Sequence, residues 1–217
     1  MKILFRSLSE TFQTIAKNPF PLFFMQVFEG TSECLLDWVT DLSLSFSPFL
    51  IAAAFPVLWV MMGFSSATTY FFIQNRDQKS GPLLRQTISA VAGKWRSLAL
   101  AQLIVGGAVT LGIFLILPGL YFLATYLFVP MCVMEGPKRS VFSYLAESQQ
   151  IARSHLWALL SAVVFALLLG LGLEEVESHL PYLLQNPVLS LFLSMVLSLN
   201  VNVFLSHCFQ HLRQGTT

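Results

Sequence analysis

The chain has 217 residues, of which 55% are hydrophobic and 11% are charged, and its formal net charge is +1 at pH 7. Soluble domains carry about 25% charged residues. This shortfall and the repeated apolar runs of about 20 residues predict a single integral membrane domain over residues 1–217. They leave no sequence for a soluble catalytic domain. The three cysteines are far apart, and we expect no disulfide framework between Cys34, Cys132 and Cys208.

Hydropathy predicts an all-α fold with six transmembrane helices. The spans are expected at 19–36, 48–74, 95–117, 118–134, 156–173 and 188–207. An amphipathic segment precedes each odd-numbered span, at 1–17, 82–94 and 135–152. We therefore predict three transmembrane hairpins, each preceded by a cytoplasmic amphipathic helix. The three units are either true repeats or a convergent anchoring pattern.

The distribution of charge predicts the orientation. In the six-span layout all 12 Lys and Arg residues fall on one side, whereas most of the acidic residues near the span ends fall on the other. Because basic residues are retained in the cytoplasm, both termini are expected there. The predicted location is a bacterial cytoplasmic (inner) membrane.

A motif around the fourth span carries a family resemblance. It consists of Leu117-Pro118-Gly119-Leu120-Tyr121, Pro130, Glu135-Gly136, Arg139-Ser140 and a helix that leads to Trp157. This motif resembles the glycerophosphodiester phosphodiesterase membrane-domain-like family of bacterial six-span membrane proteins of unknown function. The resemblance implies a six-helix inner-membrane domain. It does not imply phosphodiester hydrolysis, because the hydrolytic domain of such fusions is a separate soluble barrel.

An acidic stripe lies at the predicted outer end of the first span. Its members recur every four residues and so share one helix face: Glu29, Glu33, Asp37 and Asp41. A solvated helix end explains this stripe. The alternatives are a face that binds a partner, or a cation or proton site, since carboxylate oxygens are ligands for hard cations.

Polar residues within the predicted spans define a candidate path through the bundle. They are Gln26, Glu29, Gln102, Ser198, Asn200 and Asn202. Small and polar residues in spans also serve packing, because close approach and hydrogen bonds hold membrane helices together. On that interpretation Gly106, Gly107 and Gly112 pack the third span.

Basic residues on the predicted inner side are candidate contacts for lipid headgroups. They are Arg76, Lys79, Arg85, Lys94, Arg96, Lys138, Arg139 and Arg153. The alternative is that they only determine topology. No aromatic–basic platform accompanies them, so we expect no nucleic-acid partner. His207 and His211 lie one turn apart, but two histidines are not a metal site, and we expect no metal or other cofactor.

The sequence contains no constellation of catalytic residues. It therefore favours a non-enzymatic membrane scaffold or accessory subunit that organises a lipid or a protein partner, which could be a second copy of the chain. The alternative is a small transporter or channel that uses the polar path.

Overall fold

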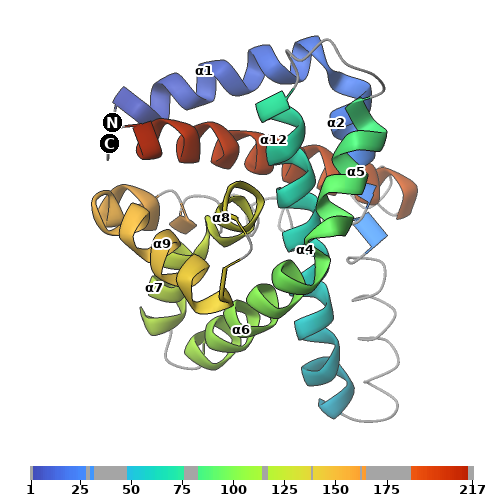
Figure 1. Cartoon of the computed structure of the whole chain (residues 1–217). Coiled ribbons are helices and arrows are strands. Elements are labelled where there is room, and N and C mark those ends of the chain that lie inside the picture. The colour runs from blue at the N-terminus through green and yellow to red at the C-terminus, as the bar shows by residue number, and fades with distance from the viewer. Residues whose placement is uncertain are drawn as a thin grey trace.

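A computed structural model describes residues 2–27, 30–31, 48–75, 83–113, 117–137, 139–161, 163–164 and 187–214 (Figure 1). Within these ranges the protein is helical and has no strand. The helices are α1 (Lys2–Lys17), α2 (Pro19–Met25), α4 (Pro48–Asn75), α5 (Leu83–Gly93), α6 (Trp95–Ile113), α7 (Leu117–Tyr126), α8 (Val129–Glu135), α9 (Val141–Arg153) and α12 (Pro187–Gln214). The predicted all-α class is confirmed.

Three segments of the described chain are long and apolar enough to cross a membrane. They are Val57–Asn75, Trp95–Gly112 and Leu117–Glu135. They coincide with the predicted second, third and fourth spans. The other three spans are not confirmed. Parts of the spans at 19–36 and 156–173 lie outside the described residues, and 188–207 falls within α12, which is not among the three segments.

The three predicted amphipathic segments all form helices, namely α1, α5 and α9. Each is followed by a short break and then by a further helix. The breaks are at Asn18, at Lys94, and at Ser154 with His155. The backbone N–H at each break still donates to the preceding turn, with N–O distances of 3.1 Å for Asn18, 3.0 Å for Lys94 and 3.1 Å for His155.

The first two of these helix–break–helix units are related by a shift of 76 residues, which aligns Thr87 with Thr11. The same shift aligns further identical residues: Ala16 with Ala92, Leu22 with Leu98, Gln26 with Gln102 and Gly30 with Gly106. Both threonines, both leucines and both glutamines are buried. The third unit keeps the buried leucine as Leu159 and has one extra residue at its break. This correspondence favours true repetition of the unit.

The fourth span, expected at 118–134, differs from its prediction at one point. Pro118 and Gly119 lie in the first turn of α7, where proline is tolerated, so the span begins where it was expected. It is not one helix, however, because turn residues 127 and 128 separate α7 from α8. Pro130 lies in the first turn of α8 and has no N–H to continue the ladder from α7.

Small residues allow the central helices to approach closely. A Cβ built on Gly112 of α6 would lie 2.7 Å from the Cα of Gly119 in α7. A Cβ on Gly106 would lie 2.6 Å from the Trp59 ring of α4. By contrast, a Cβ on Gly107 would meet nothing within 4 Å. The packing role predicted for Gly106 and Gly112 is thus confirmed, whereas Gly107 makes no such contact.

The N-terminal and C-terminal helices lie side by side. Figure 1 shows α1 and α12 along one end of the molecule, with both chain termini at the same corner and α12 crossing α4. The side of α1 that faces α12 is polar, since Ser7, Thr11 and Thr14 are all buried. This arrangement positions two groups of polar side chains, one where α12 crosses α4 and one between α1 and α12.

Candidate functional site

The first group is centred on Gln26, at the point where α2 ends. Gln26 follows Met25 in a turn, and its backbone N–H donates to the carbonyl of Phe23 at 3.0 Å. Its side chain is fully buried. Side chains from α4 and α12 converge on it, and we call the set the Gln26 cluster: Gln26, Ser65, Thr69, Ser198 and Asn202.

The carboxamide of Gln26 is bonded at both ends. Its Oε1 accepts from Ser65 Oγ at 2.9 Å, Asn202 Nδ2 at 3.0 Å and Ser198 Oγ at 3.2 Å. Its Nε2 donates to Thr69 Oγ1 at 3.1 Å. The buried amide therefore has protein partners at both its donor and its acceptor, as a polar group in an apolar environment requires.

Asn202 connects this cluster to the rest of α4. Its Oδ1 accepts from Ser66 Oγ at 2.6 Å, and its Nδ2 also lies 3.5 Å from Ser65 Oγ. Ser65 Oγ in addition lies 3.4 Å from the carbonyl of Met25, next to the break in the first predicted span. The single hydroxyl proton of Ser65 serves the closer Gln26 oxygen, so the cluster joins this break to α4 and α12 through side chains.

The structure brings together only some of the predicted path residues. Gln26, Ser198 and Asn202 meet in the cluster, but Asn200 donates to the Val196 carbonyl of its own helix at 2.7 Å. Gln102 is buried against Gly63, where a Cβ on Gly63 would lie 2.3 Å from its Cγ. Glu29 and the remaining acidic stripe of Glu33, Asp37 and Asp41 lie outside the described residues.

Sequence reasoning did not include the α4 hydroxyls of the cluster in the path. Ser65, Ser66 and Thr69 were visible only as a polar half of the second span. Their pattern gave no indication of which neighbouring helix they would face. Gln26 and Gln102 occupy equivalent positions in the first two units. This equivalence is the sequence signal that could have identified Gln26 as a buried polar position.

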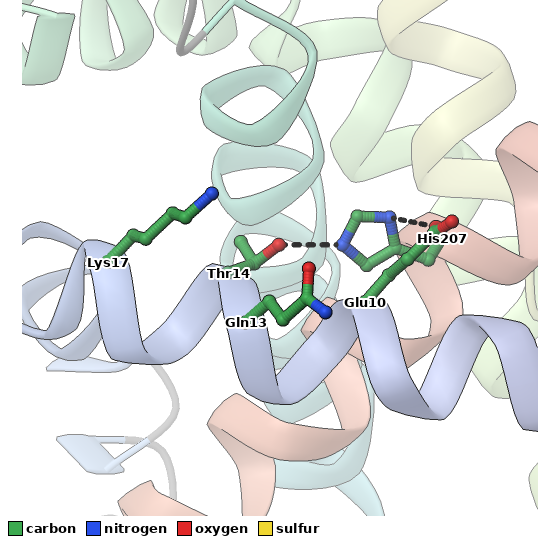
Figure 2. Close-up of a pocket in the computed structure, with 5 residues that line it drawn as sticks. All are labelled: Glu10, Gln13, Thr14, Lys17 and His207. Atoms are coloured by element: carbon green, nitrogen blue, oxygen red, sulfur yellow. Dashed lines mark hydrogen bonds and ion pairs between the residues drawn. The ribbon is translucent and has the colours of Figure 1, made fainter.

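The second group lines a small cavity of about 50 Å³ between α1 and α12 (Figure 2). Its lining residues are Glu10, Gln13, Thr14, Lys17 and His207. Four of the five lie on one side of α1, and His207 comes from α12. Figure 2 shows the His207 ring between Thr14 and Glu10, with the Lys17 side chain extending away from it.

Glu10 joins the two helices through charged and polar contacts. His211 Nε2 lies 2.8 Å from Glu10 Oε2, and His207 Nδ1 lies 3.4 Å from the same oxygen. Arg6 Nε donates to Glu10 Oε1 at 3.0 Å. The other nitrogen of His207, Nε2, lies 3.0 Å from Thr14 Oγ1, and which of the two atoms donates depends on the tautomer.

These contacts also set the acidity of Glu10. Burial alone would raise the pKa of the Glu10 carboxyl, but the hydrogen bonds from His211 and Arg6 and the charges of both histidines outweigh it. Its pKa therefore lies below the usual value. Within the described residues no group of three His, Cys, Asp or Glu side chains is suited to a metal ion. The two histidines instead face a carboxylate from α1.

A third group of charged residues joins the ends of several helices. Glu135, at the end of α8, accepts from Arg213 of α12 and from the Tyr70 hydroxyl of α4. Arg213 NH2 also lies 3.7 Å from Glu147 Oε1, and Arg139 NH1 lies 3.9 Å from Glu147 Oε2. The residues that lie near each other in sequence, Glu135 and Arg139, thus have different ion-pair partners.

Lys94 lies at the break between α5 and α6 and caps α8. Its Nζ donates to the carbonyls of Val133 at 2.9 Å, Met134 at 2.6 Å and Gly136 at 2.9 Å. An ammonium group has three donors, and all three are used. Burial lowers the pKa of Lys94. These bonds place its positive charge at the carbonyl end of α8, where a cation is favourable.

The other predicted headgroup contacts fall into two sets. Arg85, Arg96, Arg139 and Arg153 are exposed. Arg76, Lys79 and Lys138 lie outside the described residues.

Comparisons with known proteins gave no match. No family model matches the chain, and no curated protein or solved structure matches it.

Proposed function

We propose that this protein is a non-enzymatic scaffold or accessory subunit of the bacterial inner membrane, with six spans in three hairpins and both termini in the cytoplasm. It organises membrane lipids and a protein partner, which is either another protein or a second copy of the chain. The three apolar segments long enough to cross a membrane support the membrane location.

The observation that carries this proposal is the closed bonding of the Gln26 cluster. A transport path needs polar groups that are available to a solute. The carboxamide of Gln26 instead binds four protein side chains, and Asn202 binds Ser66 as well. Residues that could have lined a path therefore hold α2, α4 and α12 together, as structural hydrogen bonds do in membrane bundles.

Photocrosslinking from two equally exposed positions tests the scaffold role. Phe142 on α9 and Leu111 on α6 each expose 72% of their surface. A photoreactive residue at Phe142, on a predicted cytoplasmic helix, is expected to give one discrete protein adduct in native membranes. The same residue at Leu111, in a predicted span, is expected to give lipid adducts. Lipid adducts alone from both positions would contradict a protein-binding role for α9.

A specific observation also favours the alternative, a small transporter or channel. The first predicted span is interrupted at Gln26, and the interruption meets polar side chains of two other helices. Broken helices with polar groups at mid-membrane form the substrate sites of many transporters. Cysteine at Asn202 distinguishes the two functions: a scaffold protects it from small water-soluble thiol reagents, whereas a conducting path exposes it.

We also propose membership of the glycerophosphodiester phosphodiesterase membrane-domain-like family, on the motif alone. Two motif glycines make contacts that a side chain would disturb. Gly119 packs against Gly112, and a Cβ on Gly136 would lie 2.6 Å from the ring of Tyr144. The Tyr144 hydroxyl in turn donates to the Pro137 carbonyl at 2.7 Å. These contacts support a packing role for the motif and no catalytic one.

A further inference from the structure

Each of the three helix–break–helix units exposes a large apolar side chain within two residues after its break: Phe20 is 88% exposed, Trp95 is 52% exposed and Trp157 is 84% exposed. Within two residues of each break is also an exposed cation, namely Lys17, Arg96 or Arg153.

The three units also correspond at two positions counted from the break. The fourth residue after the break is a leucine with almost no exposed surface in all three units, with values of 0% for Leu22, 0% for Leu98 and 2% for Leu159. The ninth residue after the break is exposed in all three, by 44% at Val27, 41% at Leu103 and 39% at Val164. Each unit therefore turns the same side towards the protein and the same side outward.

The amphipathic helices of the first two units also expose an apolar residue. Phe12 of α1 is 61% exposed and Ile88 of α5 is 43% exposed. Phe12 and Ile88 are related by the shift that relates the first two units.

α1 separates its residues most clearly. Ser7, Thr11 and Thr14 face inward, and the apolar residues Leu8 and Phe12 are exposed. The polar residues Arg6, Gln13 and Lys17 are exposed on the opposite flank, because residues five or nine apart lie on widely separated sides of a helix. An exposed apolar flank opposite a cationic flank is the arrangement of a helix that lies in a membrane interface.

We propose that the three breaks lie at one membrane interface, with Phe20, Trp95 and Trp157 in the boundary between headgroups and acyl chains and with α1, α5 and α9 along that surface. The occupant of these outward faces is the bilayer, because aromatic rings with adjacent cations suit that boundary in particular. Arg96 already lies over the Trp95 ring, with its Cζ 5.7 Å from the ring centroid. This inference rests on the proposed membrane location. It adds the depth of the three breaks in the bilayer and the surface that faces lipid.

Depth-dependent fluorescence quenching tests this proposal in the full chain. Single cysteines at Phe20, Trp95, Trp157 and Leu103 are labelled with a fluorophore, in a background whose native cysteines are replaced and whose thermal unfolding is unchanged. A fifth label at Gln13 provides the water-exposed control. The protein is reconstituted into vesicles of phosphatidylethanolamine and phosphatidylglycerol that carry a quencher either near the headgroup or deep in the acyl chain. The ratio of shallow to deep quenching is the readout.

The proposal expects a ratio above one at all three break positions, a ratio below one at Leu103, and quenching of the Gln13 label by a water-soluble quencher. If the three break labels lie at different depths, this inference is overturned. Deep quenching at Leu103 in the same experiment would still support the proposed membrane location. A Leu103 label that no lipid quencher reaches would instead overturn the membrane location itself. Break labels shielded from every quencher would assign these faces to a protein partner and would also overturn the inference.

Discussion

Gln26 and Asn202 are 176 positions apart, and the Asn202 amide donates to the Gln26 side-chain oxygen at 3.0 Å inside the protein. This bond joins the turn after α2 to the middle of α12, with Ser65 of α4 bonded to the same oxygen. Because no water is available in an apolar interior, loss of one member leaves its partners unpaired. Each member of the cluster is therefore expected to stabilise the folded protein, and a member with more hydrogen bonds is expected to contribute more.

Asn202→Ala and Asn200→Ala form a matched pair on one helix. Asn202→Ala removes bonds to Gln26 and Ser66 and should lower the free energy of unfolding by about 1–2 kcal/mol. Within the described part of the chain Asn200 bonds only the Val196 carbonyl of its own helix, so Asn200→Ala should cost less than about 0.5 kcal/mol. Thermal unfolding in detergent measures both. Equal losses would contradict the structural role of the cluster.

Gly112 and Gly107 provide a second matched pair, in α6. Gly112→Ala places a Cβ 2.7 Å from the backbone of Gly119 and should destabilise the α6–α7 contact by about 1–3 kcal/mol. Gly107→Ala meets nothing within 4 Å and should be neutral or slightly stabilising, because alanine favours a helix by about 1 kcal/mol over glycine. The same unfolding assay checks both, and a tolerated Gly112→Ala would argue against this packing.

Lys94 and Arg96 provide a third matched pair, in which Lys94 is expected to stabilise the fold and Arg96 is expected to bind lipid. Lys94→Met removes three hydrogen bonds to the end of α8 and should lower the free energy of unfolding by about 1–3 kcal/mol. Arg96→Met leaves those bonds intact, so its unfolding should be nearly unchanged, but it should retain less anionic lipid on purification. Lipid analysis of both purified variants completes the comparison. A lipid loss confined to Lys94→Met would reverse the assignment.

The lowered pKa of Glu10 predicts that the stability of the fold depends on pH. Its pKa is lower in the folded protein than in the unfolded chain, where an unperturbed glutamate titrates at about pH 4.3. The stabilisation from ionised Glu10 is therefore fully present above that pH and is lost as pH falls through the folded pKa. Wild type should exceed Glu10→Gln in unfolding temperature at about pH 7, and the difference should shrink progressively as the pH falls below the usual glutamate value of about 4.3. A difference that persists in acid would exclude this carboxylate as its cause.

Much of the fold could be predicted from the sequence, because helices with strong periodicity or long apolar runs are determined locally. The three amphipathic helices and three of the apolar spans appear where they were expected. The fourth span differs from its prediction at a proline, because Pro130 follows a break inside it.

The candidate sites were less predictable, because they depend on which helix faces which. Periodicity placed Gln26, Ser198 and Asn202 on polar positions but could not reveal Ser65 and Thr69 as their partners. It also treated Lys94 as a surface cation, although its ammonium caps the end of α8. Such long-range contacts leave no trace in the spacing of residues along one helix.

Native mass spectrometry of the protein in native-lipid particles tests the central claim, a non-enzymatic membrane scaffold, most directly. It reads bound proteins and bound lipids in one spectrum. The scaffold function predicts a stoichiometric protein partner or a homo-oligomer, together with anionic lipids. A lone monomer that carries a specific small solute would contradict it and would favour transport through the helix bundle, with Gln26 and Asn202 as the first residues to substitute.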